Sequence, residues 1–340
     1  ETDQSASLAL GDLDLDGDLD VVVGNLNDSN RIYDNDNGTF AATATWDDGS
    51  GADNYATDIA LGDMDRDGNL DLAVAGFGDT YNTPRVYFNF FGLIDTELYW
   101  EPLDSEPIIG TTAVTWGDYN GDGYLDLALG GIEDVKTRIF YYDADQFTLA
   151  DTPGWQSIDA DNTSTLAAGD LNGDGAIDLL AGNYDQRNRL YLNQGFSLDT
   201  AVYWQAADIS QSPAEAFAWG DADNDGDLDL ALADADAITI FRNDGLDEFE
   251  EPQFQPGAPI RQPDGETWRA LAWGDANGDG WLDLAAASST LSDTTATLLL
   301  NQQTPTAPAF TTGWTAVLTN TEATAVHFAD FNNDTNLDLF

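Results

Sequence analysis

An acidic ten-residue pattern recurs along the chain at nearly constant spacing, and it constrains the fold more than any other sequence feature. Its copies read GDLDLDGDLD (11–20), GDMDRDGNLD (62–71), GDYNGDGYLD (117–126), GDLNGDGAID (169–178), GDADNDGDLD (220–229), GDANGDGWLD (274–283) and, more loosely, ADFNNDTNLD (329–338). Their first aspartates lie 51, 55, 52, 51, 54 and 55 residues apart. A fixed period of this length makes each repeat one supersecondary unit.

Each repeat can be divided into four short strands. The first precedes the acidic loop, as in DIALGD (58–63), where large and small side chains alternate with the period of two typical of a strand. A second strand follows the loop, as in LDLALGG (125–131), and a third reads RLYLN (189–193). A fourth, less regular strand often carries tryptophan. Between the large side chains of the first strands, six of seven residues are small and the seventh is His327, as expected where strands crowd around an axis.

Four strands in a repeat of about 50 residues indicate a propeller blade. We therefore predict an all-β fold: a single seven-bladed β-propeller of four-stranded antiparallel blades over residues 1–340, with an incomplete seventh blade. A solenoid of stacked sheets is the alternative, but the small residues of the inner strands favour convergence on an axis. The predicted inner strands with their loops lie near 7–20, 58–71, 113–126, 165–178, 216–229, 270–283 and 325–338.

The charge balance restricts the partners of this chain. It has 63 acidic and 10 basic residues, a formal net charge of −53 and no cysteine, yet 42% of its residues are hydrophobic, too many for a solvated acidic tail. The negative field and the lack of a basic patch disfavour nucleic acid and anionic membranes as partners. No apolar run is long enough to predict membrane insertion. No leader-like segment begins the sequence, so we expect a mature secreted product or a fragment.

The loop pattern D-x-[DN]-x-D-G-x-x-D predicts a metal site. It offers side-chain oxygens at positions 1, 3, 5 and 9 and a main-chain carbonyl at position 7. Ca²⁺ takes roughly six to eight oxygen ligands and tolerates irregular geometry, whereas zinc would require His or Cys. Glycine at position 6 permits the positive φ that turns the chain around an ion. An EF-hand is excluded because position 12, where its Glu would stand, is apolar in the first six copies.

Six Ca²⁺ sites and a weaker seventh are therefore expected, because Thr335 replaces the loop glycine of the last copy and Ala329 replaces the glycine before it. Acidic β-turns without a cation are the alternative, which seven copies in register disfavour. The predicted metal-site residues, including those at position 7, are Asp12, Asp14, Asp16, Asp18, Asp20, Asp63, Asp65, Asp67, Asn69, Asp71, Asp118, Asn120, Asp122, Tyr124, Asp126, Asp170, Asn172, Asp174, Ala176, Asp178, Asp221, Asp223, Asp225, Asp227, Asp229, Asp275, Asn277, Asp279, Trp281, Asp283, Asp330, Asn332, Asp334, Asn336 and Asp338. At position 7, the Asp18 carboxylate is expected to point to water.

The remaining side chains form no recognisable catalytic constellation, and we predict no enzyme. The single histidine, His327, is expected to pack on its inner strand. Four arginines at one repeat position are expected to pair with carboxylates of their own blades: Arg31, Arg85, Arg138 and Arg189. Three aromatic residues outside the repeat pattern are the best candidates for contact with a ligand: Tyr124, Trp268 and Trp281.

The GDxxxDGxxDL core and the RLYLNQG segment (189–195) resemble the FG-GAP/VCBS repeat family, the calcium-loop propeller blades also seen in integrin α-subunit heads. The resemblance covers essentially the whole chain. It implies an extracellular or cell-surface β-propeller with Ca²⁺ in loops on one face. Members of this family are mostly adhesion and ligand-binding modules, and they include lectins and some polysaccharide-degrading enzymes. This sequence stops within a blade and lacks an inserted domain, so integrin-style ligand binding does not carry over.

The expected function is that of a non-enzymatic adhesion or binding module for a protein or glycan ligand, stabilised by Ca²⁺. A structural subunit of an extracellular filament or surface assembly is an alternative, since an open blade could accept a strand from a neighbour. A lectin or a propeller-type polysaccharide-degrading enzyme is a further alternative. The scarcity of Lys, Arg and His disfavours a lyase, which must stabilise an anionic transition state.

Overall fold

The computed structural model describes residues 4–51, 55–76, 83–102, 110–132, 135–184, 186–199, 214–247, 252–261, 266–289, 293–304, 308–319 and 324–340. These residues form an all-β structure without a helix. Consequently, the described chain contains no helix that is long and apolar enough to cross a bilayer.

The first three blades are antiparallel sheets whose strands follow one another outward from the centre. Blade 1 comprises β1 (Gln4–Gly11), β2 (Asp20–Leu26), β3 (Arg31–Tyr33) and β4 (Trp46–Asp47). Blade 2 comprises β5 (Ala56–Gly62), β6 (Asp71–Gly76), β7 (Arg85–Phe90) and β8 (Leu93–Trp100). Blade 3 comprises β9 (Thr111–Gly117), β10 (Asp126–Gly131), β11 (Lys136–Phe140) and β14 (Trp155–Ala160), with a small hairpin of β12 (Tyr142–Asp143) and β13 (Thr148–Leu149) beside it.

The next three blades repeat this order with local differences. Blade 4 has three described strands, β15 (Thr163–Gly169), β16 (Asp178–Asn183) and β17 (Arg189–Tyr191). Blade 5 has β18 (Ala214–Gly220), β19 (Asp229–Asp234), β20 (Ala237–Leu246), β21 (Pro252–Pro256) and the short β22 (Ile260–Arg261), which also pairs with β20. Blade 6 comprises β23 (Thr267–Gly274), β24 (Asp283–Ser289), β25 (Asp293–Asn301) and β26 (Phe310–Thr319).

The structure thus contains six blades rather than seven complete ones. The last two strands, β27 (Phe328–Ala329) and β28 (Asp338–Leu339), pair only with each other in the described structure. The prediction of four strands in every blade also differs from the structure, which has three described strands in blade 4 and five in blade 5. The fourth strand of blade 4 would fall near Trp204, which lies outside the described residues, and blade 5 gains β22 because the chain folds back onto β20.

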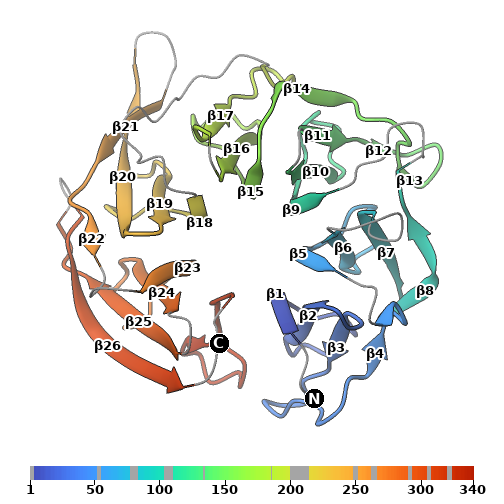
Figure 1. Cartoon of the computed structure of the whole chain (residues 1–340), viewed down its shortest axis with the longest axis horizontal. Helices are drawn as coiled ribbons and strands as arrows, with labels where there is room; N and C mark the ends of the chain where they lie inside the picture. Colours follow the sequence, from blue (N-terminus) through green and yellow to red (C-terminus); the bar gives the residue numbers. More distant parts are fainter. Residues whose placement is uncertain are drawn as a thin grey trace.

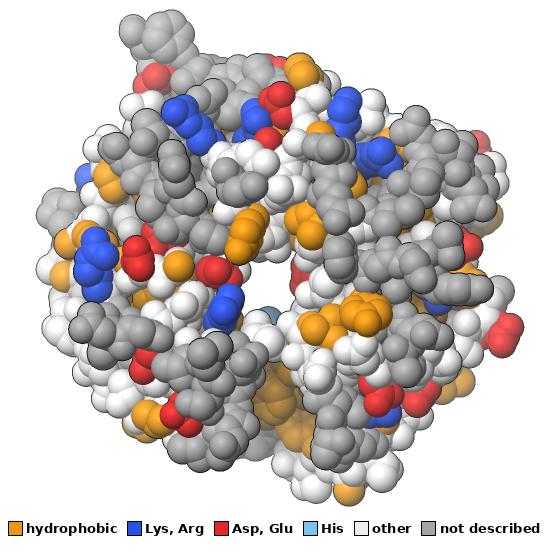
Figure 2. Space-filling view, viewed as in Figure 1, with side chains coloured by type: hydrophobic (Ala, Val, Ile, Leu, Met, Phe, Trp, Pro, Cys, Tyr) orange, Lys and Arg blue, Asp and Glu red, His pale blue; other side chains and the backbone are white. Residues whose placement is uncertain are grey.

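The blades stand around a central opening, with β1, β5, β9, β15, β18 and β23 nearest to it (Figure 1). Each of these inner strands contacts the next in chain order, and β23 also contacts β27. The space-filling view shows that the opening is not filled by side chains in the middle of this face (Figure 2).

The core is divided among the junctions between neighbouring blades. Among the described residues, an apolar cluster lies at each of the five junctions between successive blades, another lies between blade 6 and β27–β28, and a seventh lies at the seam where β27–β28 meets blade 1. At the seam, Phe331 and Ala329 pack with Val21, and the Asn35 side-chain amide donates to the carbonyl of Phe331 at 3.1 Å. Burial between sheets, rather than one central core, therefore holds the ring together.

Close packing between blades explains the glycine that precedes five of the first six acidic loops, Gly169 being the exception. A Cβ on Gly62 would lie 2.8 Å from Cδ1 of Trp116 on the next inner strand, and the Trp116 indole is held by a 3.2 Å hydrogen bond to the carbonyl of Ala60. At Gly169 the nearest atoms, on Leu228 and Trp219, are 3.5 Å away. The same sequence position is thus crowded at one junction and roomy at another.

This difference gives a matched pair of substitutions. Gly62→Ala should lower the free energy of unfolding by about 1–3 kcal/mol, because the indole ring must move out of a packed junction. Gly169→Ala should be neutral or slightly stabilising, because the added methyl meets only ordinary contacts and the unfolded chain loses entropy. Urea unfolding of both variants measures the difference. Equal destabilisation of the two would contradict the packing argument.

Candidate metal centres

The acidic loops lie at one end of the inner strands, and each joins the first strand of its repeat to the second. Neighbouring loops also contact one another. The side-chain amide of Asn224 in loop 5 donates to the carbonyl of Gly280 in loop 6 at 3.0 Å. The Arg66 guanidinium of loop 2 lies 5.8 Å from the ring centre of Tyr124 in loop 3. The loops therefore form a continuous acidic rim on one face of the ring.

Backbone amides within each loop donate to its acidic side chains. In loop 2, Asp63 accepts hydrogen bonds from the amides of Asp67 and Gly68 at 3.0 and 3.1 Å, and Asp65 accepts from Asp67 at 3.1 Å. The bonds from the amides of positions 5 and 6 to the position-1 carboxylate recur in all seven loops. The loop backbone thus fixes the carboxylates in one repeated arrangement.

This arrangement brings predicted ligands together. In three loops, three carboxylates each offer an oxygen within 4.8 Å of the other two: Asp12, Asp14 and Asp20; Asp63, Asp65 and Asp67; Asp221, Asp223 and Asp225. The other four loops carry asparagine at position 3, and in three of them its side-chain oxygen accepts the position-5 amide as the aspartates of loops 1 and 2 do. Positions 1 and 3 therefore converge in these three loops, together with position 5 in loops 2 and 5 and with position 9 in loop 1.

Two positions in each loop, rather than one, have a left-handed backbone. Position 6, predicted to need glycine, has φ between +74° and +100° in all seven copies, Thr335 having the lowest value. Position 4 is also left-handed, which sequence reasoning missed, although its glycines and asparagines were a usable signal. Its residues are Leu15, Arg66, Gly121, Gly173, Asn224, Gly278 and Asn333.

The ninth loop position is buried and ties the loop to the third strand. One Asp178 oxygen accepts from the amide of Leu171 at 2.9 Å, and the other accepts from the amide of Asn193 at 2.7 Å. Equivalent pairs of bonds occur in loops 1, 2, 3 and 5. Burial raises the pKa of this carboxyl to about 6 at one position and about 7 at four others: Asp20, then Asp71, Asp126, Asp178 and Asp229.

The asparagine that follows the third strand was not singled out from the sequence, yet it links neighbouring blades. The Asn193 side-chain amide donates to the carbonyls of Ile177 in its own loop and of Tyr119 in the preceding loop, at 3.0 and 2.8 Å. The same pair of bonds is made by Asn35, Asn89 and Asn301, and Asn243 makes the bond to the preceding loop. The N of the RLYLN pattern was the available signal.

Position 7 differs from expectation. The Asp18 carboxylate was predicted to point to water, but it is buried and accepts from the amide of Asn37 at 2.7 Å and the side chain of Asn333 at 2.5 Å. The prediction was wrong because position 7 faces the preceding loop across the junction. The Tyr124 ring stacks on Tyr142 with centroids 4.7 Å apart, so one of its faces is covered.

Three other predictions can be judged from the described contacts. Trp268, proposed as a ligand contact, is only 2% exposed and belongs to the core between blades 5 and 6, so that prediction was wrong. The His327 ring donates from Nε2 to the carbonyl of Leu8 at 3.1 Å, and burial lowers its pKa. Two of the repeated arginines pair with carboxylates of their own blades as predicted, Arg31 with Asp28 and Arg85 with Glu101. Arg189 of blade 4 instead pairs with Asp159 on β14 of blade 3 and with Asp161 in the connection between the two blades.

Loop 5 provides a test of whether these loops suit a cation. Both carboxylate oxygens of Asp223 are buried and have no hydrogen-bond partner. Burial, together with the charges of Asp225 and Asp221, raises the pKa of Asp223 to about 6. A buried carboxylate without donors is unfavourable unless a positive charge approaches it. The donor set of hard oxygens and the unpartnered Asp223 oxygens both fit Ca²⁺.

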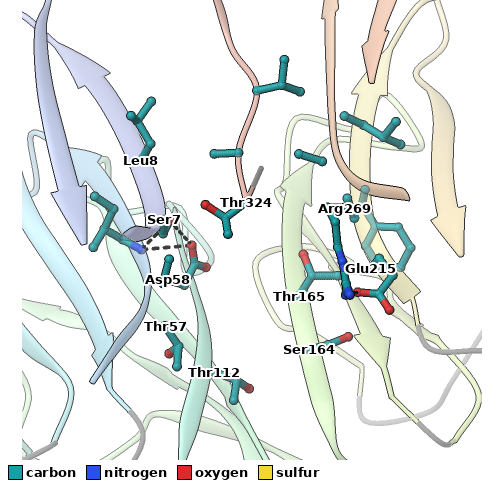
Figure 3. Close-up of a pocket in the computed structure, with 18 of the residues that line it drawn as sticks. Ser7, Leu8, Thr57, Asp58, Thr112, Ser164, Thr165, Glu215, Arg269 and Thr324 are labelled. Carbon is teal, nitrogen blue, oxygen red and sulfur yellow. Dashed lines mark hydrogen bonds and ion pairs between the residues drawn. The ribbon is translucent and has the colours of Figure 1, made fainter. Parts of the chain in front are cut away.

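A second candidate site lies in the central channel, toward the other end of the inner strands. This pocket has a volume of about 360 Å³ (Figure 3). A register shift in each of the first six inner strands bulges one residue, and these residues line the pocket: Ala6, Thr57, Thr112, Ser164, Glu215 and Arg269. Bulges redirect side chains in this way.

Charged groups stand on two sides of the pocket. Arg269 pairs with Glu215 at 2.8 Å. Asp58 accepts from the Ser7 hydroxyl and from the amides of Ile59 and Val114, all at 3.0 Å, and thereby connects three blades. Burial raises the pKa of Asp58 to about 6. The pocket is therefore polar, and the bonds of Asp58 also give it a structural role.

Loop 7 has the same left-handed backbone at position 6 as the other loops, although its residue there is threonine rather than glycine. A β-branched side chain at a φ of +74° is strained, and Thr335 occupies the place of glycine. Its amide still donates to Asp330 at 2.7 Å. Thr335→Gly should therefore raise the free energy of unfolding by about 1 kcal/mol, measured by urea unfolding. Thr335→Ala retains a Cβ and should gain less; an equal gain in both variants would refute the strain argument.

Known structures share this fold at low sequence identity. BBS1N in complex with ARL6DN, from a mercury-soaked crystal, is 11% identical with a TM-score of 0.61, over 99% of this chain and 92% of that chain. An Agrocybe aegerita lectin that recognises non-reducing terminal N-acetylglucosamine is 17% identical with a TM-score of 0.57, over 100% and 85%. Chaetomium thermophilum Raptor is 13% identical with a TM-score of 0.55, over 88% of this chain but 24% of its own length.

No curated protein matches the sequence. A family model does, and its description is FG-GAP-like repeat. It matches residues 12–74, 118–181, 170–232, 221–286 and 277–340, so that each match runs from one acidic loop through the next. These matches cover well over half of the chain, and the protein therefore belongs to the FG-GAP-like repeat family.

Proposed function

We propose that this chain is a calcium-stabilised β-propeller that serves outside the cell as a non-enzymatic binding module for a protein or glycan ligand. The observation that carries the calcium part is the set of seven loops with one repeated arrangement of carboxylates, together with the unpartnered oxygens of Asp223. The side chains at positions 1 and 3 would hold the ion, together with position 5 in loops 2 and 5 and with position 9 in loop 1. Ca²⁺ would supply the positive charge that these groups lack.

An extracellular location agrees with this proposal on chemical grounds. Calcium sites in extracellular modules are commonly weak, with dissociation constants of about 10⁻⁴–10⁻³ M, and they fill because free calcium is high there. The net charge of −53 also favours a setting in which divalent cations are plentiful.

The binding role is supported by the fold and by the use of the available side chains. One solved structure of the same fold is in complex with a protein, ARL6DN, and another recognises a sugar, N-acetylglucosamine. In this chain the single histidine bonds to a neighbouring strand, which takes it out of reach as a general base. The functional surface is therefore proposed to bind rather than to catalyse.

We also propose that β27–β28 begins a seventh blade. The seam repeats contacts found at other junctions: Asn35 bonds to Phe331 as Asn193 bonds to Tyr119, and Asn333 bonds to loop 1 as Asn224 bonds to loop 6. A second candidate function, a subunit of a surface assembly, rests on the outer edge of β28, which has no partner strand among the described residues. Size-exclusion chromatography in Ca²⁺ distinguishes the two, because a monomer at all concentrations excludes assembly.

Removal of calcium should destabilise the protein. Each loop filled at a hundred times its dissociation constant would contribute about 2.7 kcal/mol, so chelation should lower the Tm by many degrees. Scanning calorimetry in EDTA and in Ca²⁺, with Mg²⁺ at equal ionic strength as the control, measures the effect. A Tm that is the same in EDTA and in Ca²⁺ would exclude calcium as a stabilising ligand.

The stability of the calcium-free protein should depend on pH in a defined direction. The native pKa values of the ninth-position carboxyls are raised to about 6–7 from 3.8, so the folded state holds more protons than the unfolded state between about pH 4 and pH 7. Stability contributed by these groups is therefore lost as pH rises through this window. In EDTA the Tm should fall from pH 5 to pH 8, and Ca²⁺ should flatten the fall. A Tm that rises with pH in EDTA would contradict the assignment.

A further inference from the structure

In blades 1 to 6, one residue in or just after the third strand donates its backbone amide to the ninth-position carboxylate of the loop. The residue just before it varies among the blades. It is Asp34, Phe88, Tyr141, Leu192, Arg242 and Leu300 in blades 1 to 6. In blade 5 the side chain at this position reaches the third residue of its own loop, Asp223. Blade 5 alone carries a cation here, and blade 1 alone carries an anion.

Arg242 is placed against the unpartnered carboxylate of loop 5. Its Nη1 lies 3.7 Å from Oδ2 of Asp223, and its Nη2 lies 2.5 Å from Oδ1 of Asp244. The Asp223 side chain is fully buried, and the Arg242 side chain is 23% exposed. The contact with Asp223 is therefore an ion pair without a hydrogen bond, within a group of three loop carboxylates whose oxygens lie within 4.8 Å of one another.

We propose that Arg242 is a built-in counter-ion of loop 5 that competes with Ca²⁺, so that loop 5 is the last of the first six loops to fill. This inference rests on the proposed calcium function. A guanidinium and a divalent ion cannot both approach the same carboxylate without strong repulsion, because one charge lies within a few ångströms of the other. Binding at loop 5 therefore requires Arg242 to leave Asp223, whereas the other five loops have no cation to displace at this position.

Blade 1 shows the opposite arrangement at the same position. Blade 1 carries the anionic Asp34 at this position, where blade 5 carries the cationic Arg242. Loop 1 thus has one negative charge more than its own pattern provides, and loop 5 has one positive charge that opposes the ion. The third strand consequently grades the calcium affinity of loops whose own sequences are nearly identical.

Displacement of Arg242 would also change a hollow at the surface of the protein. Its side chain lines a hollow of about 420 Å³ between blades 5 and 6, whose wall includes Pro256, Ile260 and Phe310. Filling of loop 5 therefore changes the charge in the wall of this hollow, whereas filling of the other loops does not.

The test compares Arg242→Leu with the wild-type protein, because leucine occupies this position in blades 4 and 6. Calcium binding is measured by isothermal titration with a competing chelator. The weakest step among the first six should tighten at least about tenfold, since a full charge close to the ion is removed. Arg269→Leu is the matched control: it removes the same charge in the central pocket, away from the loops, and should leave the steps unchanged. Asp34→Leu should weaken the tightest step.

Thermal unfolding provides a second readout. In EDTA, Arg242→Leu should lower the Tm because Asp223 loses its counter-ion, and in saturating Ca²⁺ the loss should disappear. Equal loss in both conditions, with unchanged binding steps, would show that Arg242 only packs and would overturn the proposal. Arg242→Gln, which keeps a polar side chain beside Asp244, replaces the leucine variant if that variant does not fold. If the wild-type protein binds no Ca²⁺, the proposed function itself fails, which the wild-type titration shows separately.

Discussion

The buried carboxylate at the ninth loop position is the interaction on which the rest of this ring depends. In loop 4, Asp178 bonds to the second loop amide and to the amide of Asn193, whose side chain in turn reaches the loop of the preceding blade. One acidic side chain therefore joins a loop, the third strand of its blade and, through that strand, the neighbouring blade. Because the arrangement recurs in most blades, the geometry of the acidic rim and the spacing of the sheets are set by the same hydrogen bonds.

This arrangement places many negative charges close together, which is unfavourable. Carboxylates held side by side by backbone amides raise one another's pKa, and burial raises the pKa of the ninth position further. A ring of such loops is unfavourable by itself and becomes favourable when cations neutralise it. At loop 5 the protein itself supplies a positive charge, the Arg242 guanidinium 3.7 Å from Asp223.

The repeat, the order of strands and the convergence of loop positions 1 and 3 could be predicted from the sequence, because period and residue type report them directly. Contacts between blades could not. The Asp18 carboxylate was assigned to water, although it bonds to Asn333, 315 residues away in sequence. Trp268 looked free because it lacks a counterpart in other repeats, yet it fills a junction. The left-handed fourth position was missed because Leu15 and Arg66 do not look like residues that adopt it. Each of these depends on a partner that the repeat itself does not contain.

The packing of Trp116 on Gly62 has a consequence for how such rings can change over time. The glycine belongs to one blade and the indole that occupies its missing side chain belongs to the next, so each blade carries half of two different fits. A duplicated blade carries a glycine that packs against the neighbour of its original position. The junction at Gly169, where the nearest atoms are 3.5 Å away, would therefore tolerate an inserted blade that clashes at the tightly packed junction of Gly62. Duplication and exchange of blades should therefore succeed at some seams and fail at others, although the acidic loops on either side are nearly interchangeable.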